Sequence, residues 1–146
     1  MPNKTKIKIS LPRYLAISLP RYLATSLFFF LLSFSPPSDT AKLVATALQA
    51  GNAREVAKYF NTMVDLSLPM SDDTYSKTQA EQILRDFFTK NPVKSFKVSK
   101  QGNSADGTTY CIGTLEAGNK TFRVYFLVKS NGTQNLVQQM QIQENL

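Results

Sequence analysis

The stretch from Phe122 to Ile142 reads FRVYFLVKSNGTQNLVQQMQI and predicts two neighbouring strands of an antiparallel sheet. Side chains of its first half alternate between two faces, Phe122, Val124, Phe126 and Val128 against Arg123, Tyr125, Leu127 and Lys129. Asn131-Gly132 then predicts a type I′ hairpin turn, because both central residues of that turn need positive φ. The second strand alternates Leu136, Gln138, Met140 and Ile142 against Val137, Gln139, Gln141 and Gln143.

Shorter segments upstream show the same alternation. Phe96 and Val98 alternate with Lys97 and Ser99, and a turn at 101–107 leads to a further strand at 110–115. A turn at 117–119 joins that strand to Phe122. Earlier in the chain, residues 63–68 predict a strand with Val64, Leu66 and Leu68 on one face and Asp65 and Ser67 on the other. Pro69 ends that strand, and the polar residues 70–76 predict a loop.

Helical patterns precede most of these strands. Asp39 or Thr40 can cap a first helix, whose apolar stripe is Leu43, Val44, Ala47 and Leu48. Gly51 suits the left-handed stop position, and Asn52 with Glu55 predicts the start of a second helix. Ser76 or Thr78 can cap a third helix, which Asn91-Pro92 closes. Its apolar residues recur at helical spacing, at Ala80, Ile83, Leu84, Phe87 and Phe88.

Helices gathered ahead of an antiparallel meander predict an α+β domain with the helices packed on one face of the sheet. The predicted registers place six residues on the opposite face, namely Lys97, Cys111, Leu115, Tyr125, Leu127 and Val137. An apolar patch with a polar rim is typical of an interaction surface, so we expect a homodimer interface there. The alternative is a solvent face with scattered apolar residues.

Residues 1–35 predict a secretory signal peptide, and residues 36–146 a single domain. The octad ISLPRYLA occurs twice in tandem from Ile9 to Ala24. Its prolines oppose a helix, and two copies of eight residues are too few and too short for a repeat architecture. Basic residues come first, no acidic residue precedes Asp39, and an uncharged apolar run covers residues 22–34 before SPPS. We expect cleavage near 33–38 and a periplasmic or secreted domain. The apolar run is shorter than the roughly 20 residues of a membrane span, which argues against a membrane anchor. Because no clean A-x-A cleavage site is visible, an uncleaved signal peptide is the alternative, and it would be the one route to membrane contact.

The formal net charge of +7 belongs largely to that leader. Five of the 17 Lys and Arg residues precede Pro36, which leaves 12 basic and 10 acidic residues, a charge of +2, in the predicted domain. A lysine cluster follows the third helix, comprising Lys90, Lys94, Lys97 and Lys100, but strand alternation divides it and lysines commonly protect edge strands. We therefore expect no nucleic acid partner.

Three segments of the predicted domain resemble a known family. They are ALQAGNAREVAKYF (47–60), YSKTQAEQILRDFFTKNP (75–92) with the following KSFKV (94–98), and FRVYFLVK (122–129). They are similar to small exported bacterial proteins labelled domain of unknown function 4783, over roughly residues 41–142. The resemblance implies a cystatin-like or nuclear-transport-factor-2-like fold, a cone of helices over a curved sheet with an internal pocket. The pocket lining it implies is Phe60, Leu84, Phe88, Tyr110 and Phe126.

The chain contains no histidine, which excludes Ser-His-Asp and Cys-His nucleophiles and most zinc and haem sites. Cys111 is the single cysteine, so no internal disulfide can form. The pair Asp72-Asp73 indicates a solvated turn and not a metal site. We therefore expect no metal and no cofactor. The fold group suggests an alternative, an isomerase with an aspartate base and a tyrosine donor. Its candidate residues are Asp65, Asp86, Tyr59, Tyr75, Tyr110 and Tyr125. We favour a non-enzymatic binding domain for a small apolar ligand or an envelope protein.

Overall fold

The computed structural model describes residues 39–145. The predicted signal peptide, with its tandem octads and apolar run, lies outside these residues. Within them, no helix has both the length and the apolar character needed to cross a membrane.

Three helices and six strands make up this part of the chain. The helices are α2 (Thr40–Gln49), α3 (Ala53–Ala57) and α4 (Lys77–Lys90). The strands are β1 (Phe60–Leu68), β2 (Ser71–Ser76), β3 (Val93–Asn103), β4 (Thr109–Ala117), β5 (Lys120–Ser130) and β6 (Asn135–Glu144).

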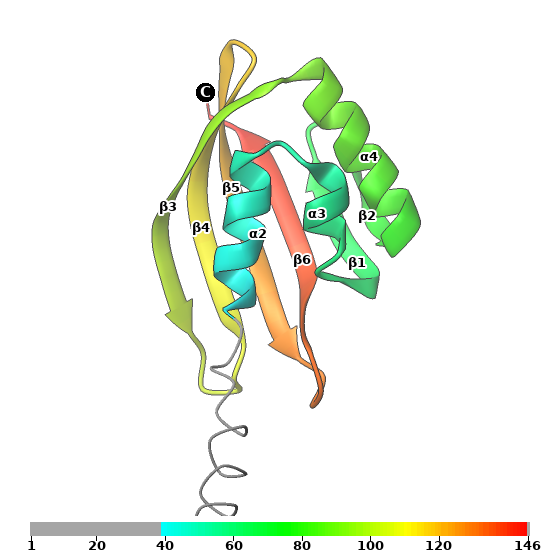
Figure 1. Ribbon diagram of the computed structural model, residues 1–146, viewed down its shortest axis with the longest axis vertical. Coiled ribbons are helices and arrows are strands. Elements are labelled where there is room, and N and C mark those ends of the chain that lie inside the picture. The colour runs from blue at the N-terminus through cyan, green and yellow to red at the C-terminus, as the bar shows by residue number, and fades with distance from the viewer. Residues whose placement is uncertain (1–38, 146) are drawn as a thin grey trace, which may run out of the picture. The chain divides into compact units, whose positions relative to one another are not determined.

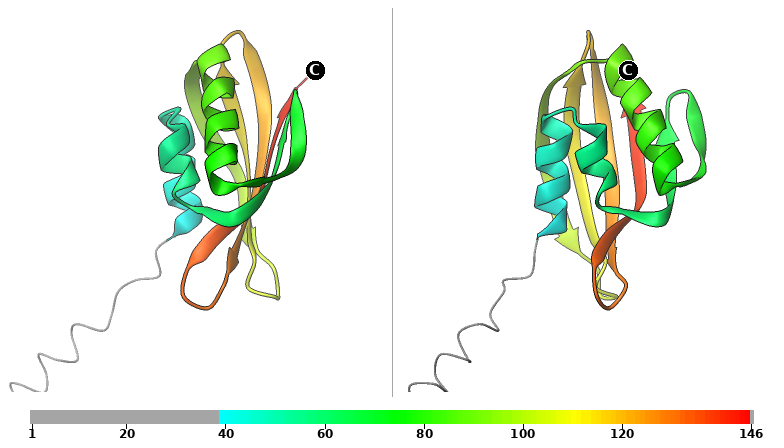
Figure 2. Two further views of the ribbon diagram at one scale, coloured as in Figure 1. Left: turned by 90° about the vertical axis from the view of Figure 1, so that its right-hand side faces the viewer. Right: turned by 45° about the vertical axis from the view of Figure 1, so that its right-hand side comes forward.

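The strands form one sheet in the order β2-β1-β6-β5-β4-β3. Neighbouring strands are antiparallel except β1 and β6, which run parallel. Figures 1 and 2 show all three helices against the same face of the sheet. No described element covers the other face, which we call the outer face. This is the α+β arrangement that the sequence predicts.

Local signals set the helix boundaries as expected. The Asp39 side chain accepts a hydrogen bond from the Lys42 backbone at 3.2 Å, and Gly51 has φ +63° between α2 and α3. Asn52 Oδ1 accepts from the Glu55 backbone at 3.1 Å and so caps α3. Ser76 begins α4 with a complete capping box, in which Gln79 bonds back to the Ser76 backbone. Each cap satisfies a backbone N–H that has no partner within its helix.

The core lies between the helices and the inner face of the sheet. Its largest side chains with almost no exposure include Phe60, Phe122, Phe126, Leu48, Leu66, Leu84, Leu115 and Met140. Two residues predicted to face inward do not. Leu43 is 42% exposed on α2, where Thr40 and Ala41 are buried instead. Val98 is 44% exposed on β3, which is an edge strand of the sheet.

Two further expectations about the strands and turns are wrong. Residues 71–76 form the edge strand β2 and pair with β1, although a loop was expected there. The β5–β6 connection is a four-residue loop instead of a type I′ turn, because Ser130 pairs with Asn135. Asn131 closes this loop, since its Oδ1 accepts from the Gln134 backbone at 2.9 Å.

A register shift between Leu127 and Val128 also changes which side chains of β6 face the core. Val137, expected on the outer face, pairs with Val128 and is fully buried. Met140 and Ile142 are buried as the sequence predicts. One irregular pairing is enough for this change, because side chains of a strand alternate with a period of two.

Candidate functional site

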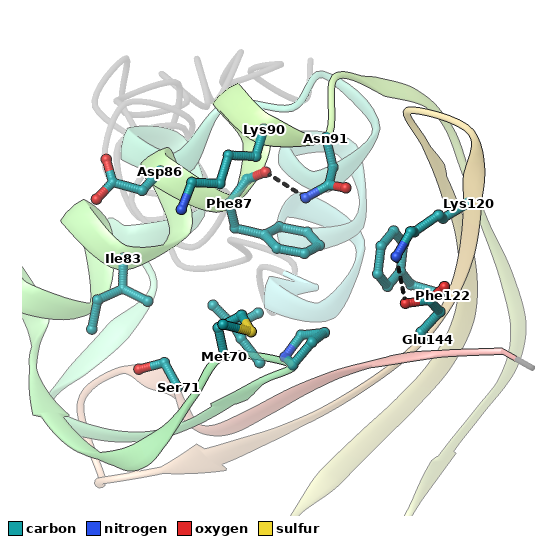
Figure 3. Close-up of a pocket in the computed structure, with 12 residues that line it drawn as sticks. Met70, Ser71, Ile83, Asp86, Phe87, Lys90, Asn91, Lys120, Phe122 and Glu144 are labelled. Atoms are coloured by element: carbon teal, nitrogen blue, oxygen red, sulfur yellow. Dashed lines mark hydrogen bonds and ion pairs between the residues drawn. The ribbon is translucent and has the colours of Figure 1, made fainter.

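A cavity of about 410 Å³ opens at one end of the helix layer. It lies between the C-terminal half of α4, the β1–β2 turn and the adjoining ends of β5 and β6 (Figure 3). Its lining consists of Leu68, Pro69, Met70, Ser71, Ile83, Asp86, Phe87, Lys90, Asn91, Lys120, Phe122 and Glu144.

Local sequence explains why this end of the core stays open. Pro69 ends β1, so the chain turns away through Met70, whose side chain is 96% exposed. On the opposite side α4 stops at Asn91, whose Nδ2 donates to the Phe87 carbonyl at 3.1 Å. Between these two ends the rings of Phe87 and Phe122 meet with centroids 5.1 Å apart. The two rings give the cavity an apolar wall.

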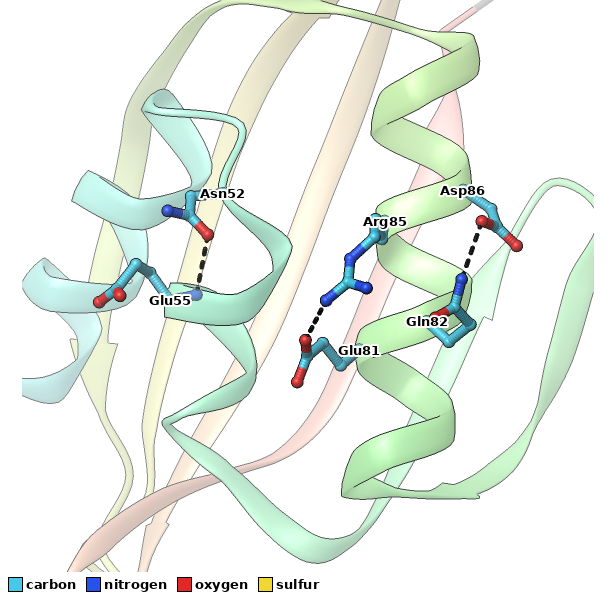
Figure 4. A network of polar contacts seen from close by, with 6 residues as sticks. All are labelled: Asn52, Glu55, Glu81, Gln82, Arg85 and Asp86. Atoms are coloured by element: carbon cyan, nitrogen blue, oxygen red, sulfur yellow. Dashed lines mark hydrogen bonds and ion pairs between the residues drawn. The ribbon is translucent and has the colours of Figure 1, made fainter.

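Four charged side chains surround that apolar wall. Lys120 Nζ pairs with Glu144 Oε2 at 2.8 Å across the end of the sheet. Asp86 accepts from Gln82 Nε2 at 3.2 Å along α4, as Figure 4 shows beside the Glu81–Arg85 pair of the same helix and the Asn52 cap of α3. In Figure 3 the Asp86 carboxylate points away from the Phe87 ring. The rim is thus polar and the interior apolar, which is the usual construction of a small-molecule pocket.

The residues expected to line a pocket are not those that line this cavity. Phe60, Leu84, Phe88 and Phe126 are instead buried in the core. Tyr110 pairs with Leu127 on the outer face of the sheet. Sequence periodicity identifies side chains that face inward, but this cavity is formed where elements end. The sequence does indicate where two of these elements end, because Pro69 ends β1 and Asn91-Pro92 ends α4. Pro69 and Asn91 both line the cavity.

The catalytic candidates are dispersed. Asp65 lies on the outer face of β1 and accepts from Thr74 Oγ1 at 2.6 Å. Asp86 lines the cavity, whereas the hydroxyl of Tyr75 lies 2.6 Å from Ser71 Oγ. Tyr59 is half-buried where α3 meets β1, and Tyr125 lies on the outer face. No aspartate–tyrosine hydrogen bond occurs within residues 39–145. The same residues contain no cluster of three Cys, Asp or Glu side chains suited to a metal ion.

The family model described as Domain of unknown function (DUF4783) matches residues 41–143. The chain belongs to this family. The DUF4783 protein of Bacteroides ovatus ATCC 8483 is 33% identical, with a TM-score of 0.67 over 71% of this chain and 94% of that one. A comparison with the curated proteins found no match.

More distant solved structures show the fold of this DUF4783 domain. An NTF2-like protein of unknown function from Cytophaga hutchinsonii ATCC 33406 has a TM-score of 0.56 at 14% identity, covering 76% of this chain and 93% of that one. A Catenulispora acidiphila DSM 44928 protein with a ketosteroid isomerase-like fold, solved in complex with trimethylamine, has a TM-score of 0.58 at 11% identity. That match covers 76% of this chain and 88% of the other. The resemblance stated from the sequence is confirmed for family and fold.

Three of the six residues expected on the outer face of the DUF4783 domain lie in the core instead. Cys111 and Leu115 pair with Phe126 and Phe122, so all four side chains face the helices. Val137 joins them through the register shift of β6. Lys97, Tyr125 and Leu127 do lie on the outer face. Burial, together with the negative charge of Asp39, raises the pKa of the Cys111 thiol from 9.0 to about 11.

Proposed function

We propose that this DUF4783 protein is an exported, non-enzymatic binding domain that holds a small apolar ligand in the cavity beside Phe87 and Phe122. One observation carries the proposal, the apolar cavity of about 410 Å³ behind a charged rim. Ligand pockets span roughly 300–1,000 Å³ and rely on apolar walls with a few polar groups for orientation. The cavity therefore has room for a compact molecule and the chemistry to desolvate it.

The fold is compatible with this role, since the Catenulispora acidiphila protein was solved with trimethylamine. Which ligand the present chain takes depends on its own cavity. The Lys120–Glu144 pair neutralises two of the four rim charges, so charge does not dominate the interior. A ligand gains most of its binding free energy here by removing apolar surface from water.

A titration with the neutral fluorescent probe N-phenyl-1-naphthylamine tests the cavity. Ile83 lines the cavity, and the Ile83→Phe variant should fill part of it. The matched control is Leu43→Phe, which places the same ring on the exposed side of α2. We expect the probe to bind, to lose at least about tenfold in affinity with Ile83→Phe, which is 1.4 kcal/mol, and to be unaffected by Leu43→Phe. Absence of probe binding, or equal loss in both variants, would refute the proposal.

Export is tested by the mass of the untagged full-length protein recovered from a bacterial envelope fraction. Native mass spectrometry should show a chain that begins between residues 33 and 38, and any retained ligand should add a reproducible mass. A chain that keeps its first 35 residues would refute cleavage. Recovery from the cytoplasm alone would refute export.

Of its two aspartate candidates, the enzyme alternative keeps only Asp86 at the cavity, because Asp65 lies on the opposite face of the sheet. Among the candidate tyrosine donors, Tyr75 forms a hydrogen bond with Ser71, a residue that lines the cavity. Proton transfer from a bound substrate would need Asp86 to turn inward from Gln82. Isomerisation of a bound enolisable ketone that is abolished by Asp86→Asn would favour the enzyme over the binding domain.

A further inference from the structure

Two side chains at the mouth of the cavity carry opposite charges and form no salt bridge with any other residue in 39–145. They are Asp86 and Lys90 of α4, and both are exposed. Asp86 accepts a hydrogen bond from the neutral side chain of Gln82 at 3.2 Å. The other two charged residues of the lining, Lys120 and Glu144, pair with each other at 2.8 Å. One negative group and one positive group are therefore available to a ligand.

Helical spacing places both available groups on one face of α4. Ile83, Asp86 and Lys90 follow one another at intervals of three and four residues, which brings their side chains to the same side of the helix. In Figure 3 the Asp86 carboxylate and the Lys90 ammonium group lie on the same side of the Phe87 ring as Ile83, and Lys120 lies on the other side. The mouth thus has a dipolar end beside α4 and a neutralised end beside the sheet.

Neighbouring charged residues do not neutralise Asp86 or Lys90. Arg85 forms a salt bridge with Glu81 along α4 (Figure 4). Asp73 is on the side of β2 that faces the helices, since it pairs with the buried Leu66. It does not line the cavity, and its carboxylate accepts from the Thr74 backbone at 2.7 Å. Asp86 and Lys90 therefore determine the charge that a ligand meets at this end of the mouth.

These two groups and the apolar wall together define the chemistry of a ligand. Any molecule that fills the cavity up to its mouth removes part of the water around both groups, which is unfavourable unless the molecule interacts with them. A neutral molecule makes no ionic contact with either group, and a molecule with one charge leaves the other group without a partner. A zwitterion provides an ammonium group for Asp86 and a carboxylate for Lys90. The rest of the molecule must be apolar to lie against Phe87 and Phe122.

We propose that the ligand is a free amino acid with an apolar side chain, bound through its ammonium group to Asp86 and through its carboxylate to Lys90. This inference rests on the proposed function, because it names the ligand class of the same cavity. Side chains four residues apart on a helix have Cβ atoms about 5–6 Å apart, so both can reach charged groups attached to one carbon atom. These contacts are made at the mouth, in contact with water. They therefore select among ligands more than they strengthen binding.

Displacement of N-phenyl-1-naphthylamine by three related compounds tests the ligand class. L-Phenylalanine carries both charges, 3-phenylpropionate lacks the ammonium group, and 2-phenylethylamine lacks the carboxylate. We expect the wild type to bind phenylalanine at least about fivefold more tightly than either analogue, which corresponds to about 1 kcal/mol for each exposed ion pair.

Each of two variants should remove one of these preferences. Lys90→Met should abolish the preference for phenylalanine over 2-phenylethylamine and keep the preference over 3-phenylpropionate, and Asp86→Asn should do the reverse. A purely structural role of either residue would weaken all three compounds alike. The matched controls are Lys129→Met, near the far end of β5 from the cavity, and Glu116→Gln, on the outer face of β4. Both controls should keep both preferences, and circular dichroism verifies that every variant is folded.

The outcomes separate this inference from the proposed function. A probe that binds but is not displaced by phenylalanine, or is displaced equally by all three compounds, would overturn the amino acid ligand and leave the apolar cavity as a binding site. Preferences that persist in both variants would also overturn it. If the probe does not bind, the proposed function fails, and calorimetry with phenylalanine alone then decides. Binding that both variants weaken would support the amino acid ligand, and absence of binding would overturn it.

Discussion

The ring of Phe87 on α4 meets the ring of Phe122 on β5 nearly edge to face, at an interplanar angle of 77° with centroids 5.1 Å apart. Aromatic pairs favour this geometry because the positive edge of one ring contacts the negative face of the other. The contact fastens the helix layer to the sheet and also forms a wall of the cavity. The two side chains therefore contribute both to stability and to the cavity in which we propose that a ligand binds.

Truncation of Phe122 should be costly. Phe122 is 1% exposed, so Phe122→Ala removes a buried ring and leaves a void that the sheet cannot close. We expect the free energy of unfolding to fall by about 3–5 kcal/mol in urea denaturation. Leu43→Ala, on the exposed side of α2, should cost a small fraction of that. Equal losses in the two variants would contradict the packing described here.

Gly113 has no room for a side chain. A Cβ at this position would lie 2.5 Å from Phe96 Cζ and 2.7 Å from the Lys97 carbonyl oxygen. Gly113→Ala should therefore reduce the free energy of unfolding by about 1–3 kcal/mol through overpacking. Adding Phe96→Leu, which removes the nearest atom, should make the double variant more stable than the sum of the single losses predicts. Strict additivity would show that Phe96 does not cover Gly113.

Cys111 should be protected from thiol reagents. Its pKa is raised to about 11 by burial and by Asp39, and the thiolate is the reactive form. At pH 8 we expect dithionitrobenzoate to leave the folded protein unlabelled and to label it at once in urea. Rapid labelling of the folded protein would show that the thiol is accessible.

The same raised pKa affects stability at high pH. The folded state holds the thiol proton more tightly than the unfolded state, whose pKa is near 9.0. The contribution of Cys111 is therefore complete below pH 9 and is lost as pH rises through about 11. The free energy of unfolding should decline less steeply from pH 9 to 11 in Cys111→Ala than in the wild type. Parallel slopes would show that the thiol does not titrate differently on unfolding.

The sequence leaves open whether Ser76 or Thr78 caps α4, and in the structure the cap is Ser76. Ser76 Oγ accepts from the Gln79 backbone at 3.4 Å, and Gln79 Oε1 accepts from the Ser76 backbone at 3.1 Å. Ser76→Ala should lower the free energy of unfolding by about 1 kcal/mol, because it leaves an N–H of the first turn without this partner. Thr78→Ala, one residue inside the helix, is the control and should be nearly neutral. The opposite order of effects would assign the cap to Thr78.

Local features account for the parts of the fold that the sequence predicts well. Caps at Asp39, Asn52 and Ser76 depend on residues within three positions, and the alternation of β5 is uninterrupted from Phe122 to Val128. β2 was missed because SDDTYS has no apolar face, and its strand forms only by pairing with β1. Such pairing is a long-range contact, which local periodicity does not encode.

Bulges explain most of the remaining differences. The irregular pairing between β5 and β6 moves Val137 into the core, because the next side chain along a strand points the other way. The cavity escaped prediction for another reason. Its walls come from Met70 in the β1–β2 turn and from Ser71, Lys120 and Glu144, which lie at the ends of three different strands. Sequence patterns describe the interiors of elements better than the places where their ends meet.

The parallel pairing of β1 with β6 has a consequence for the order in which the domain can fold. β6 lies between β1 and β5, so the hairpin of β1 and β2 has no strand to join until residues 135–144 are available for pairing. The first strand and the last are therefore partners, and the contact between them closes a loop of most of the domain. Closing so long a loop is slow compared with forming hairpins. The domain thus remains open, with β1 and β2 detached from the other strands, until its final strand pairs between β1 and β5.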